Sequence, residues 1–253
     1  MNKKPLGHKN YGSIPHLPGS RMGSGDHHCH EGQANIATVK KRDKNDEIIV
    51  QEKLDGSNVG VARIDDEIIA LGRAGYPASS SPWMQHRYFH RWVLKNHDRF
   101  WNVLENGERL VGEWLLQAHG TRYQLEHEPF VAFDLMVGHV RAPLNDLERF
   151  WESGFRMPHQ VHCGDAISVK QAMFLLGTYG EHGALDPVEG LVYRVERDRP
   201  TGVKGEKKRK VDFLVKYVRP DKEDGIYLPD VSGGKTIWNV NPLEVVGKGE
   251  DDA

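Results

Sequence analysis

Short apolar segments rich in β-branched residues recur along the chain, and turn-forming residues interrupt each of them. Segments of this length and composition are typical of strands, and Asp65-Asp66 predicts a hairpin turn. Because the first three segments follow one another across short turns, they predict a β-meander and sheets that are mostly antiparallel. The predicted strands cover residues 47–53, 58–64, 68–71, 109–115, 129–137, 187–195 and 211–218.

Helical periodicity is strongest over residues 82–104, where Tyr88, Trp92, Phe100 and other apolar residues recur at helical spacing. A proline at position 82 is compatible with a first helical turn, and Asn106-Gly107 provides a stop. Weaker patterns predict helices over residues 143–151 and 169–176. This mixture of elements predicts an α+β fold in which helices flank the sheets.

The composition divides the chain into three parts. Residues 1–45 are rich in Gly, Pro, His and Lys and show no helical or strand period, which predicts an irregular arm packed on the core. Residues 46–246 contain all the predicted strands and helices and are expected to form one domain. Residues 247–253 are predicted to be a charged tail that frays.

The overall charge excludes a protein whose whole surface is positively charged and attracts nucleic acid in that way. The 253 residues contain 34 Lys and Arg against 36 Asp and Glu, a formal net charge of −2, so a polyanion must bind to a local patch. The two cysteines are too few for a disulfide framework or a four-cysteine zinc site. No apolar run approaches the roughly 18 residues that span a bilayer. These features predict a cytoplasmic protein without a membrane partner.

The segment Lys53-Leu54-Asp55-Gly56-Ser57 is the first candidate for chemistry. On a strand, Lys53 and Asp55 point to one face, and Gly56 allows a tight turn beside a ligand. A lysine with a lowered pKa can act as a covalent nucleophile, and the nearby carboxylate can orient it or bind a metal. Taken alone, however, a lysine before an Asp-Gly turn is more often the solvated end of a hairpin.

Five further short motifs follow in order, each on or beside a predicted strand. Each has an ordinary structural explanation by itself: Phe133 as a core residue, Glu113 and Glu189 as edge charges, Arg73 as the end of a hairpin. The occurrence of all five motifs in this order is much harder to explain by separate structural roles. The motifs are Gly72-Arg73, Gly112-Glu113-Trp114, Phe133-Asp134-Leu135, Glu189-Gly190-Leu191-Val192 and Leu214-Val215-Lys216.

Together these motifs resemble the covalent nucleotidyltransferases, which comprise polynucleotide ligases and mRNA capping enzymes. The Gly-Glu-Trp motif followed by Ala-Phe-Asp-Leu is similar to the RNA ligase 2 branch of ATP-dependent RNA ligases, and the resemblance covers about residues 47–219. It implies a nucleotidyltransferase fold whose two antiparallel sheets enclose an ATP cleft. It also implies the sealing of RNA 5′-phosphate and 3′-hydroxyl ends with ATP and Mg²⁺, for which Mn²⁺ is an alternative.

The resemblance also implies a role for each matching residue. Lys53 would attack the α-phosphate of ATP and hold AMP, while Asp55 and Glu189 would hold a hydrated magnesium ion. Arg73 would contact the nucleotide or the 5′-phosphate, and Glu113 the ribose. The remaining assignments are Phe133 stacking on adenine, Lys216 neutralising the α-phosphate, and Glu52 and Gly56 lining the nucleotide site, Glu52 through its backbone.

One position departs from the pattern of the resembled family. The family usually has a second lysine two positions after the one matched by Lys216, but this chain has Val218 there and Arg219 next. We therefore expect the second cation to come from elsewhere or to be absent.

Two other functions remain open. Residues 219–253 are too few for the OB-fold that follows this domain in DNA ligases and capping enzymes, which argues against both; a small ATP-dependent DNA ligase is the first alternative. The second is a nucleotide- or RNA-binding module that has the fold but no ligation activity. The type of RNA break, the oligomeric state and the involvement of an end-healing kinase-phosphatase stay open.

Several other segments carry weaker signals. Asp26-His27-His28-Cys29-His30-Glu31 has metal-ligand residue types, but adjacent residues cannot all reach one ion, so a polar loop is the better interpretation. The basic run from Lys204 to Lys210 is either a solvated turn or a contact to RNA phosphates. Residues 119–122 and Arg21 are further candidates for phosphate contacts.

Overall fold

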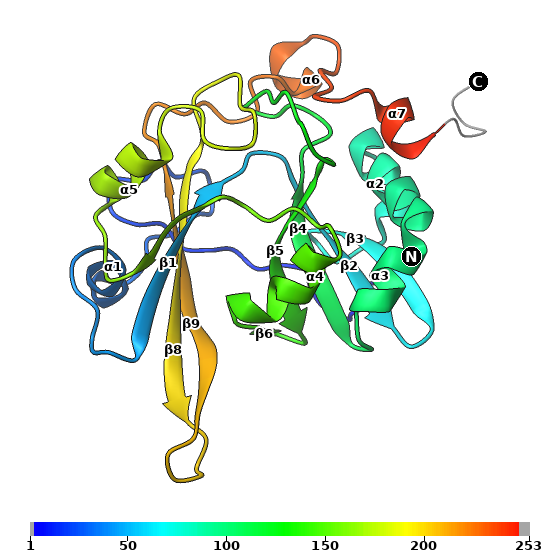
Figure 1. The fold of residues 1–253 in the computed structure, drawn as a ribbon. Helices are drawn as coiled ribbons and strands as arrows, with labels where there is room; N and C mark the ends of the chain where they lie inside the picture. The colour runs from blue at the N-terminus through cyan, green and yellow to red at the C-terminus, as the bar shows by residue number, and fades with distance from the viewer. Residues whose placement is uncertain (1–2, 248–253) are drawn as a thin grey trace.

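A computed structural model describes residues 3–247 as two antiparallel sheets with helices on their outer faces (Figure 1). In spatial order, sheet A contains β7 (Gln160–Gly164), β1 (Asp46–Lys53), β8 (Gly190–Pro200) and β9 (Lys207–Val218). Sheet B contains β3 (Glu67–Gly72), β2 (Ser57–Ile64), β4 (Glu108–Trp114), β5 (Phe130–Val137) and β6 (Val140–Arg141). The predicted α+β architecture is confirmed.

Seven α-helices and two 3₁₀ segments complete the described part of the chain. The α-helices are α1 (Glu31–Thr38), α2 (Met84–Lys95), α3 (His97–Val103), α4 (Glu148–Glu152), α5 (Val169–Leu176), α6 (Pro229–Ser232) and α7 (Pro242–Val246). The 3₁₀ segments are η1 (Ala78–Ser80) and η2 (Leu144–Leu147). No helix within residues 3–247 combines the length and apolar character that crossing a bilayer requires.

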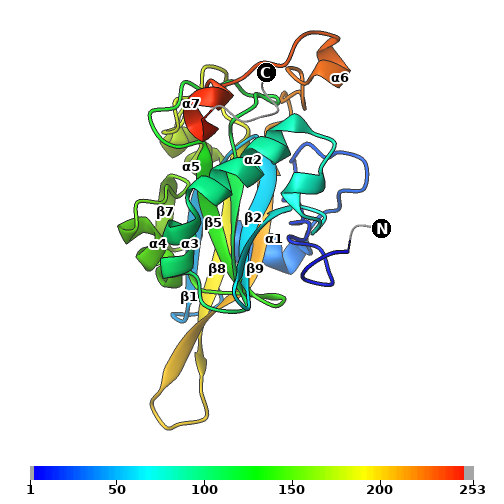
Figure 2. The ribbon, with the colours of Figure 1, turned by 90° about the vertical axis from the view of Figure 1, so that its right-hand side faces the viewer.

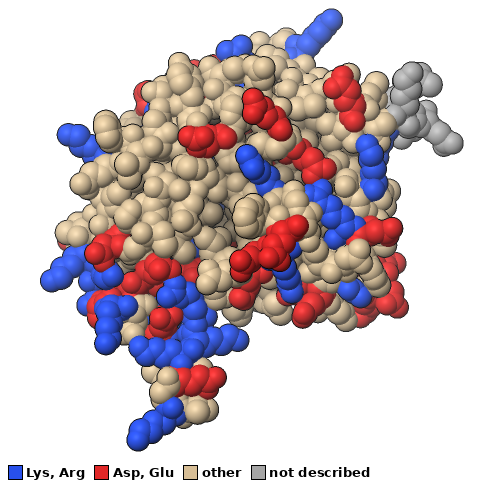
Figure 3. All heavy atoms as spheres, in the orientation of Figure 1, with Lys and Arg blue, Asp and Glu red and all other residues tan. Residues whose placement is uncertain are grey.

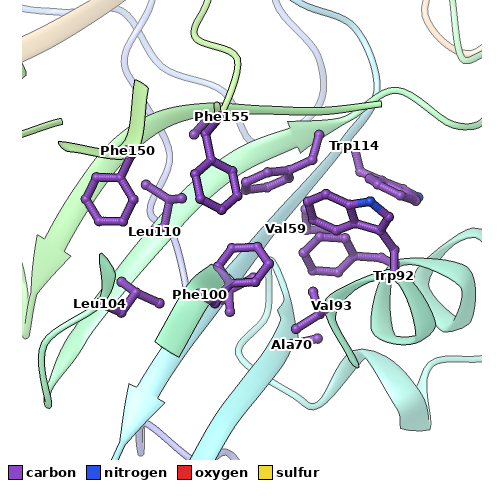
Figure 4. Close-up of a cluster of buried hydrophobic side chains, with 14 of the residues drawn as sticks. Val59, Ala70, Trp92, Val93, Phe100, Leu104, Leu110, Trp114, Phe150 and Phe155 are labelled. Carbon is purple, nitrogen blue, oxygen red and sulfur yellow. The ribbon is translucent and has the colours of Figure 1, made fainter. Parts of the chain in front are cut away.

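Each sheet has its own hydrophobic core on its outer face. The aromatic-rich core of sheet B lies between its strands and α2 and α3, where Trp92 packs against Trp114 (Figure 4). The ring of Phe130 also contacts Trp92. The core of sheet A is mainly aliphatic, with Tyr123 and Tyr193 among its members, and packs against α1 and α5 through residues such as Ala37 and Ala172. Because each sheet buries its outer face under helices, the two inner faces are left to form a cleft.

The structure differs from the predicted elements where local side chains decide the backbone. The predicted helix over residues 82–104 is divided at Asn96, whose backbone (φ −106°, ψ 21°) leaves the helical region. The side-chain amide of Asn96 donates to the Trp92 carbonyl at 2.9 Å and so competes with the helical backbone. The predicted helix over 143–151 is a 3₁₀ segment followed by α4.

The arm and the end of the chain also differ from expectation. The arm is not wholly irregular, because it contains α1, which buries only the small residues Ala34 and Ala37 and so has a weak apolar period. The short edge strand β7 was not predicted, and residues 219–247 contain only the short helices α6 and α7. Of the predicted charged tail, only Gly247 lies within the described residues.

The basic run lies in a hairpin that projects from the body of the molecule (Figures 1 and 2). β8 and β9 extend to Pro200 and Lys207, so most of the charged connection is strand rather than turn. Lys204, Lys208 and Lys210 are exposed. Lys and Arg side chains gather over this hairpin and its base, where Asp and Glu are interspersed (Figure 3). A contact to RNA phosphates by this hairpin stays a prediction.

A buried histidine makes the fold sensitive to acid. His182 is 3% exposed, accepts a hydrogen bond from the His159 backbone N–H at 3.1 Å, and bonds His127 at 2.9 Å. Burial, reinforced by His127, Arg156 and His159, lowers the pKa of His182 to about 3. The unfolded chain therefore binds more protons between pH 6.5 and 3, and stability falls as the pH falls through that range.

We expect the free energy of unfolding of the wild type to fall by about 2.5 kcal/mol more than that of His182→Gln between pH 6.5 and 4.5. Glutamine keeps an acceptor and a donor at this position but does not titrate. Urea unfolding at several pH values measures the difference. Equal pH dependence of the two proteins would show that His182 does not resist protonation in the fold.

Candidate active site

A cavity of about 690 Å³ opens between the inner faces of the two sheets. It contains all nine residues that the sequence singled out, although they come from segments up to 164 positions apart, from Glu52 to Lys216. The nine lining residues are Glu52, Lys53, Asp55, Gly56, Arg73, Glu113, Phe133, Glu189 and Lys216. The fold therefore brings the scattered motifs to one place.

Lys53 and Glu189 form an ion pair at the centre of the cavity. Lys53 is the last residue of β1, and Glu189 immediately precedes β8, the neighbouring strand, so the register of the two strands places them side by side. The Lys53 Nζ donates to Glu189 Oε2 at 2.6 Å, and the two side chains are 20% and 10% exposed. A lysine held this way is aimed into the cavity rather than into solvent.

One oxygen of the Asp55 carboxylate is fixed by two hydrogen bonds and an ion pair. Its Oδ2 accepts hydrogen bonds from the Gly120 backbone N–H and the Thr121 hydroxyl, both at 3.1 Å. The Nζ of Lys222 lies 3.3 Å from the same oxygen and also donates to the Gly120 carbonyl at 2.6 Å. Since Asp55 Oδ1 has no hydrogen bond within the described residues, it is available to a ligand in the cavity.

Gly56 and Glu113 connect the two sheets at the floor of the cavity. The Gly56 N–H donates to Glu113 Oε1 at 3.1 Å, which holds the carboxylate beside Lys53. A Cβ at position 56 would lie 2.6 Å from the Trp114 carbonyl oxygen, so only glycine allows this approach of β2 to β4.

A bulge in β5 turns Phe133 into the cavity. Ala132 pairs with Gly112 and Asp134 pairs with Val111, so Phe133 is the extra residue of the bulge. Its ring packs edge-on against Tyr11 of the arm, with ring centroids 5.3 Å apart. The ring face left by this edge contact suits stacking by a planar base.

Arg73 and Lys216 lie beside the arm. Arg73 is exposed, follows β3, and donates to the Ser13 hydroxyl at 3.3 Å. Lys216 on β9 lies 3.6 Å from Asp26 Oδ1, measured from Nζ. Glu52 lines the cavity, but its carboxylate accepts from the Glu181 backbone N–H at 3.0 Å, so its side chain is directed away from Lys53 as strand alternation predicts.

The cavity concentrates acidic groups around one amine. Burial raises the pKa of Glu113 and of Glu189 to about 7, an effect that Lys53 opposes and neighbouring carboxylates reinforce. Burial lowers the pKa of Lys53, but Glu189, Glu113 and Asp55 outweigh burial and hold it above its usual value. Lys53 is thus protonated at neutral pH until positive charge arrives to neutralise these carboxylates.

The donor set fits a hydrated metal ion better than a closed metal centre. Within residues 3–247, no group of three or more His, Cys, Asp or Glu side chains is arranged to hold a metal. Asp55 and Glu189 provide carboxylate oxygens on the same cavity. Magnesium accepts such partial protein coordination because it keeps several waters and takes further ligands from substrate phosphates.

Several lining residues escaped the sequence analysis. Asn58 follows the Lys-Leu-Asp-Gly-Ser segment directly, and its buried Oδ1 has no hydrogen-bond partner within residues 3–247. His86 and His119 line the same wall; burial, together with His119, lowers the pKa of His86 to about 4. Strand alternation could have revealed Asn58, because it predicts that Asn58 and the neighbouring Ser57 point to opposite faces of the strand. His86 lies on a helix that no motif marks, whereas His119 belongs to the segment of residues 119–122 that the sequence had proposed for phosphate contacts.

Lys222 also went unnoticed, because it follows the last predicted strand and reaches Asp55 only through the fold of residues 219–226. It is 6% exposed and pairs with the Asp55 carboxylate. Lys222 does not line the cavity. It therefore neutralises Asp55 from behind rather than reaching a ligand.

We expect Lys222→Met to lower the free energy of unfolding by about 3 kcal/mol, because it leaves Asp55 and the Gly120 carbonyl buried without their cationic partner. Urea unfolding measures the loss. Lys170→Met, which removes an exposed lysine on α5, is the matched control. A loss no larger than that of the control would show that the buried pair contributes nothing net.

The weaker sequence signals have mixed outcomes. The guanidinium of Arg21 pairs at 2.5 Å with Asp224, a residue that lines the cavity. Arg122 pairs instead with Asp186 at 3.0 Å. The histidine-rich segment of residues 26–31 forms no metal cluster among the described residues.

Comparison with known proteins assigns the chain to a family. Residues 46–218 match the sequence profile of the family described as RNA ligase. A comparison with curated proteins finds no match. Among solved structures, a mutant RNA ligase from Naegleria gruberi in its apo form is 16% identical, with a TM-score of 0.50 over 81% of this chain and 59% of its own.

Form 2 of an archaeal ATP-dependent RNA ligase is 19% identical, with a TM-score of 0.45 over 68% of this chain and 42% of its own. The chain thus spans between two fifths and three fifths of the length of these solved proteins. At such low identity the likeness concerns the fold alone. The match to the family profile covers more than two thirds of the sequence, and the chain belongs to the RNA ligase family.

Proposed function

We propose that this protein is an ATP-dependent RNA ligase that joins 5′-phosphate and 3′-hydroxyl RNA ends through a covalent lysyl-AMP intermediate. The observation that carries the proposal is the pairing of Lys53 Nζ with Glu189 Oε2 at 2.6 Å inside a cavity large enough for a nucleotide. Membership of the RNA ligase family and the names of the ATP-dependent relatives support the choice of ATP and RNA.

In the first step the Lys53 amine attacks the α-phosphate of ATP, a nitrogen–phosphorus bond forms, and the bond to pyrophosphate breaks. Lys53 must first lose a proton, and it does so when positive charge arrives to neutralise the Glu189 and Glu113 carboxylates that hold its pKa above the usual value. Lys216, on β9 of the same sheet as Lys53, supplies positive charge to the cavity where negative charge develops on the phosphate.

Phe133 and Glu113 orient the nucleoside in this proposal. The Phe133 ring stacks on adenine, and Glu113, held by the Gly56 N–H, accepts hydrogen bonds from the ribose. Arg73 at the exposed side contacts the nucleotide or the RNA 5′-phosphate.

Asp55 and Glu189 would hold a magnesium ion, with manganese as an alternative. The bound ion supplies positive charge that lowers the pKa of Lys53 and offsets charge on the phosphates. A Naegleria gruberi RNA ligase has been solved with ATP and Mn, which supports the same requirement here.

In the second and third steps, AMP passes from Lys53 to the RNA 5′-phosphate, and the 3′-hydroxyl then displaces AMP. The RNA partner follows from the family, whereas an end-healing kinase-phosphatase as protein partner stays a prediction. A cytoplasmic location, which rests on the cysteine count, also stays a prediction.

The decisive experiment incubates the protein with Mg²⁺ and either α-³²P-ATP or α-³²P-GTP, and then denatures it. Label that stays on the protein with ATP alone supports the proposal. The labelled protein is then given 5′-phosphorylated RNA or DNA ends, with and without a complementary strand. Sealing of DNA but not RNA would make it a DNA ligase, and no label with any divalent ion would leave only a binding role.

A further inference from the structure

The arm runs along the edge of sheet A beside Lys216. The Lys216 backbone N–H donates to the Pro15 carbonyl at 2.9 Å, and the Leu17 N–H donates to the Lys216 carbonyl at 2.8 Å. Further along, the Val218 N–H donates to the Ser20 hydroxyl at 2.9 Å. Because β9 is the last strand of the sheet, these bonds satisfy an edge that would otherwise be open. The arm therefore fixes the backbone of a cavity-lining lysine.

The same arm presents a carboxylate to the lysine side chain. Asp26 Oδ1 lies 3.6 Å from Lys216 Nζ, and Asp26 Oδ2 lies 3.0 Å from His16 Nε2 and accepts from the Gly23 N–H at 3.0 Å. His16 is 1% exposed, and its Nδ1 is 2.7 Å from the Ser20 hydroxyl. Asp26 is thus anchored on one oxygen while the other faces Lys216.

Lys216 needs such an anchor because it shares a cavity with a second ammonium group. Burial and Lys53 lower the pKa of Lys216, whereas Asp26 and then Glu189 raise it, and Arg73 adds a further lowering effect. Glu189 is already the partner of Lys53. Within residues 3–247, Asp26 is the one carboxylate in ion-pair contact with Lys216. Without it, the Lys216 ammonium would be drawn toward Glu189 and would compete with Lys53.

We propose that Asp26 of the arm, held by the Gly23 N–H, is a positioning residue that keeps the Lys216 side chain directed at the reacting phosphate. The proposal rests on the function proposed above. It makes the arm part of the catalytic centre, since Asp26 lies more than 180 residues before the lysine that it positions.

The test compares Asp26→Asn with the wild type in lysyl-AMP formation. Asparagine keeps an acceptor for the Gly23 N–H, so the loop retains its turn. We expect the rate at saturating ATP to fall about tenfold with a smaller change in the KM for ATP, as for an interaction used in the transition state. Asp26→Glu should restore part of the rate. Asp165→Asn, at a carboxylate paired with Lys41 outside the cavity, should leave it unchanged.

A double-mutant cycle shows whether Asp26 acts through Lys216. In a Lys216→Ala background, Asp26→Asn should have no further effect on the residual rate. Equal rates for Asp26→Asn and the wild type, or additive losses in the cycle, would overturn the proposal. A wild type that forms no lysyl-AMP would instead contradict the proposed function.

A measurement that does not depend on ligation separates the positioning role of Asp26 from the proposed ligase function. Brief acetylation followed by mass spectrometry measures the reactivity of each lysine amine. Removal of the Asp26 charge should lower the pKa of Lys216 and raise its acetylation about tenfold, while the exposed Lys170 is unaffected. Unchanged reactivity of Lys216 would refute the positioning role even if the protein had no ligase activity.

Discussion

Lys53→Ala is expected to lower covalent attachment of AMP by about 10⁴-fold or more, because alanine offers no nucleophile to the α-phosphate. Lys53→Arg should fail equally, although it keeps a positive charge opposite Glu189, since a guanidinium is not deprotonated in proteins. The measurement is label that stays on the denatured protein after incubation with α-³²P-ATP, with the sample kept out of acid because acid hydrolyses the nitrogen–phosphorus bond.

The fold should tolerate the loss of Lys53. Burial raises the pKa of Glu189 to about 7, and removal of the opposing Lys53 charge raises it further, so that Glu189 takes up a proton at neutral pH instead of remaining a buried unpaired charge. Lys170→Ala is the matched control for labelling. Label that persists on Lys53→Ala would assign the nucleophile to another residue and contradict the proposed mechanism.

Asp134→Asn is expected to lower the free energy of unfolding by about 3–5 kcal/mol, because it breaks a buried charge network from the centre. Asp134 is fully buried and pairs with Arg194 at 2.5 Å and Arg141 at 3.1 Å. It also accepts a hydrogen bond from the Tyr11 hydroxyl. Arg194 pairs in turn with Glu196 at 2.8 Å, so the network joins β5 of sheet B to β8 of sheet A.

Calorimetry should record a fall in Tm of about 10 °C for this variant. Asp146→Asn, an exposed carboxylate in η2, is the control and should change Tm by no more than about 1 °C. Because Arg194 is 1% exposed, it cannot regain water when its partner loses charge. A Tm within 2 °C of the wild type would show that the network is not needed to join the sheets.

The candidate site was more predictable than the fold around it. Lys53, Asp55 and Glu189 lie on or at the ends of strands whose apolar patterns are clear, so their order along the chain and their strand faces could be inferred. Phe133 lines the cavity through a bulge, which no local pattern predicts. Asn58, His86, His119 and Lys222 carry no local signal as strong as a motif.

Among the secondary-structure elements, errors arose where tertiary contacts override weak local patterns. Helix α1 buries only two alanines and depends on sheet A for its stability, so its amphipathic period is nearly absent. The break at Asn96 depends on one side-chain amide that competes with the helical backbone. The extension of β8 and β9 into a charged hairpin depends on cross-strand pairing rather than on hydrophobicity.

The amino-acid order alone predicted the α+β class and the ordered short motifs, with Lys53 as the proposed nucleophile, because strand periodicity and short motifs are local properties. Only the folded chain decided which charges surround that amine: Lys222 behind Asp55, and Asp26 beside Lys216. Those partners come from segments with no distinctive pattern of their own. Coulombic interactions depend on distance in space, and distance between remote segments is set by packing rather than by sequence position.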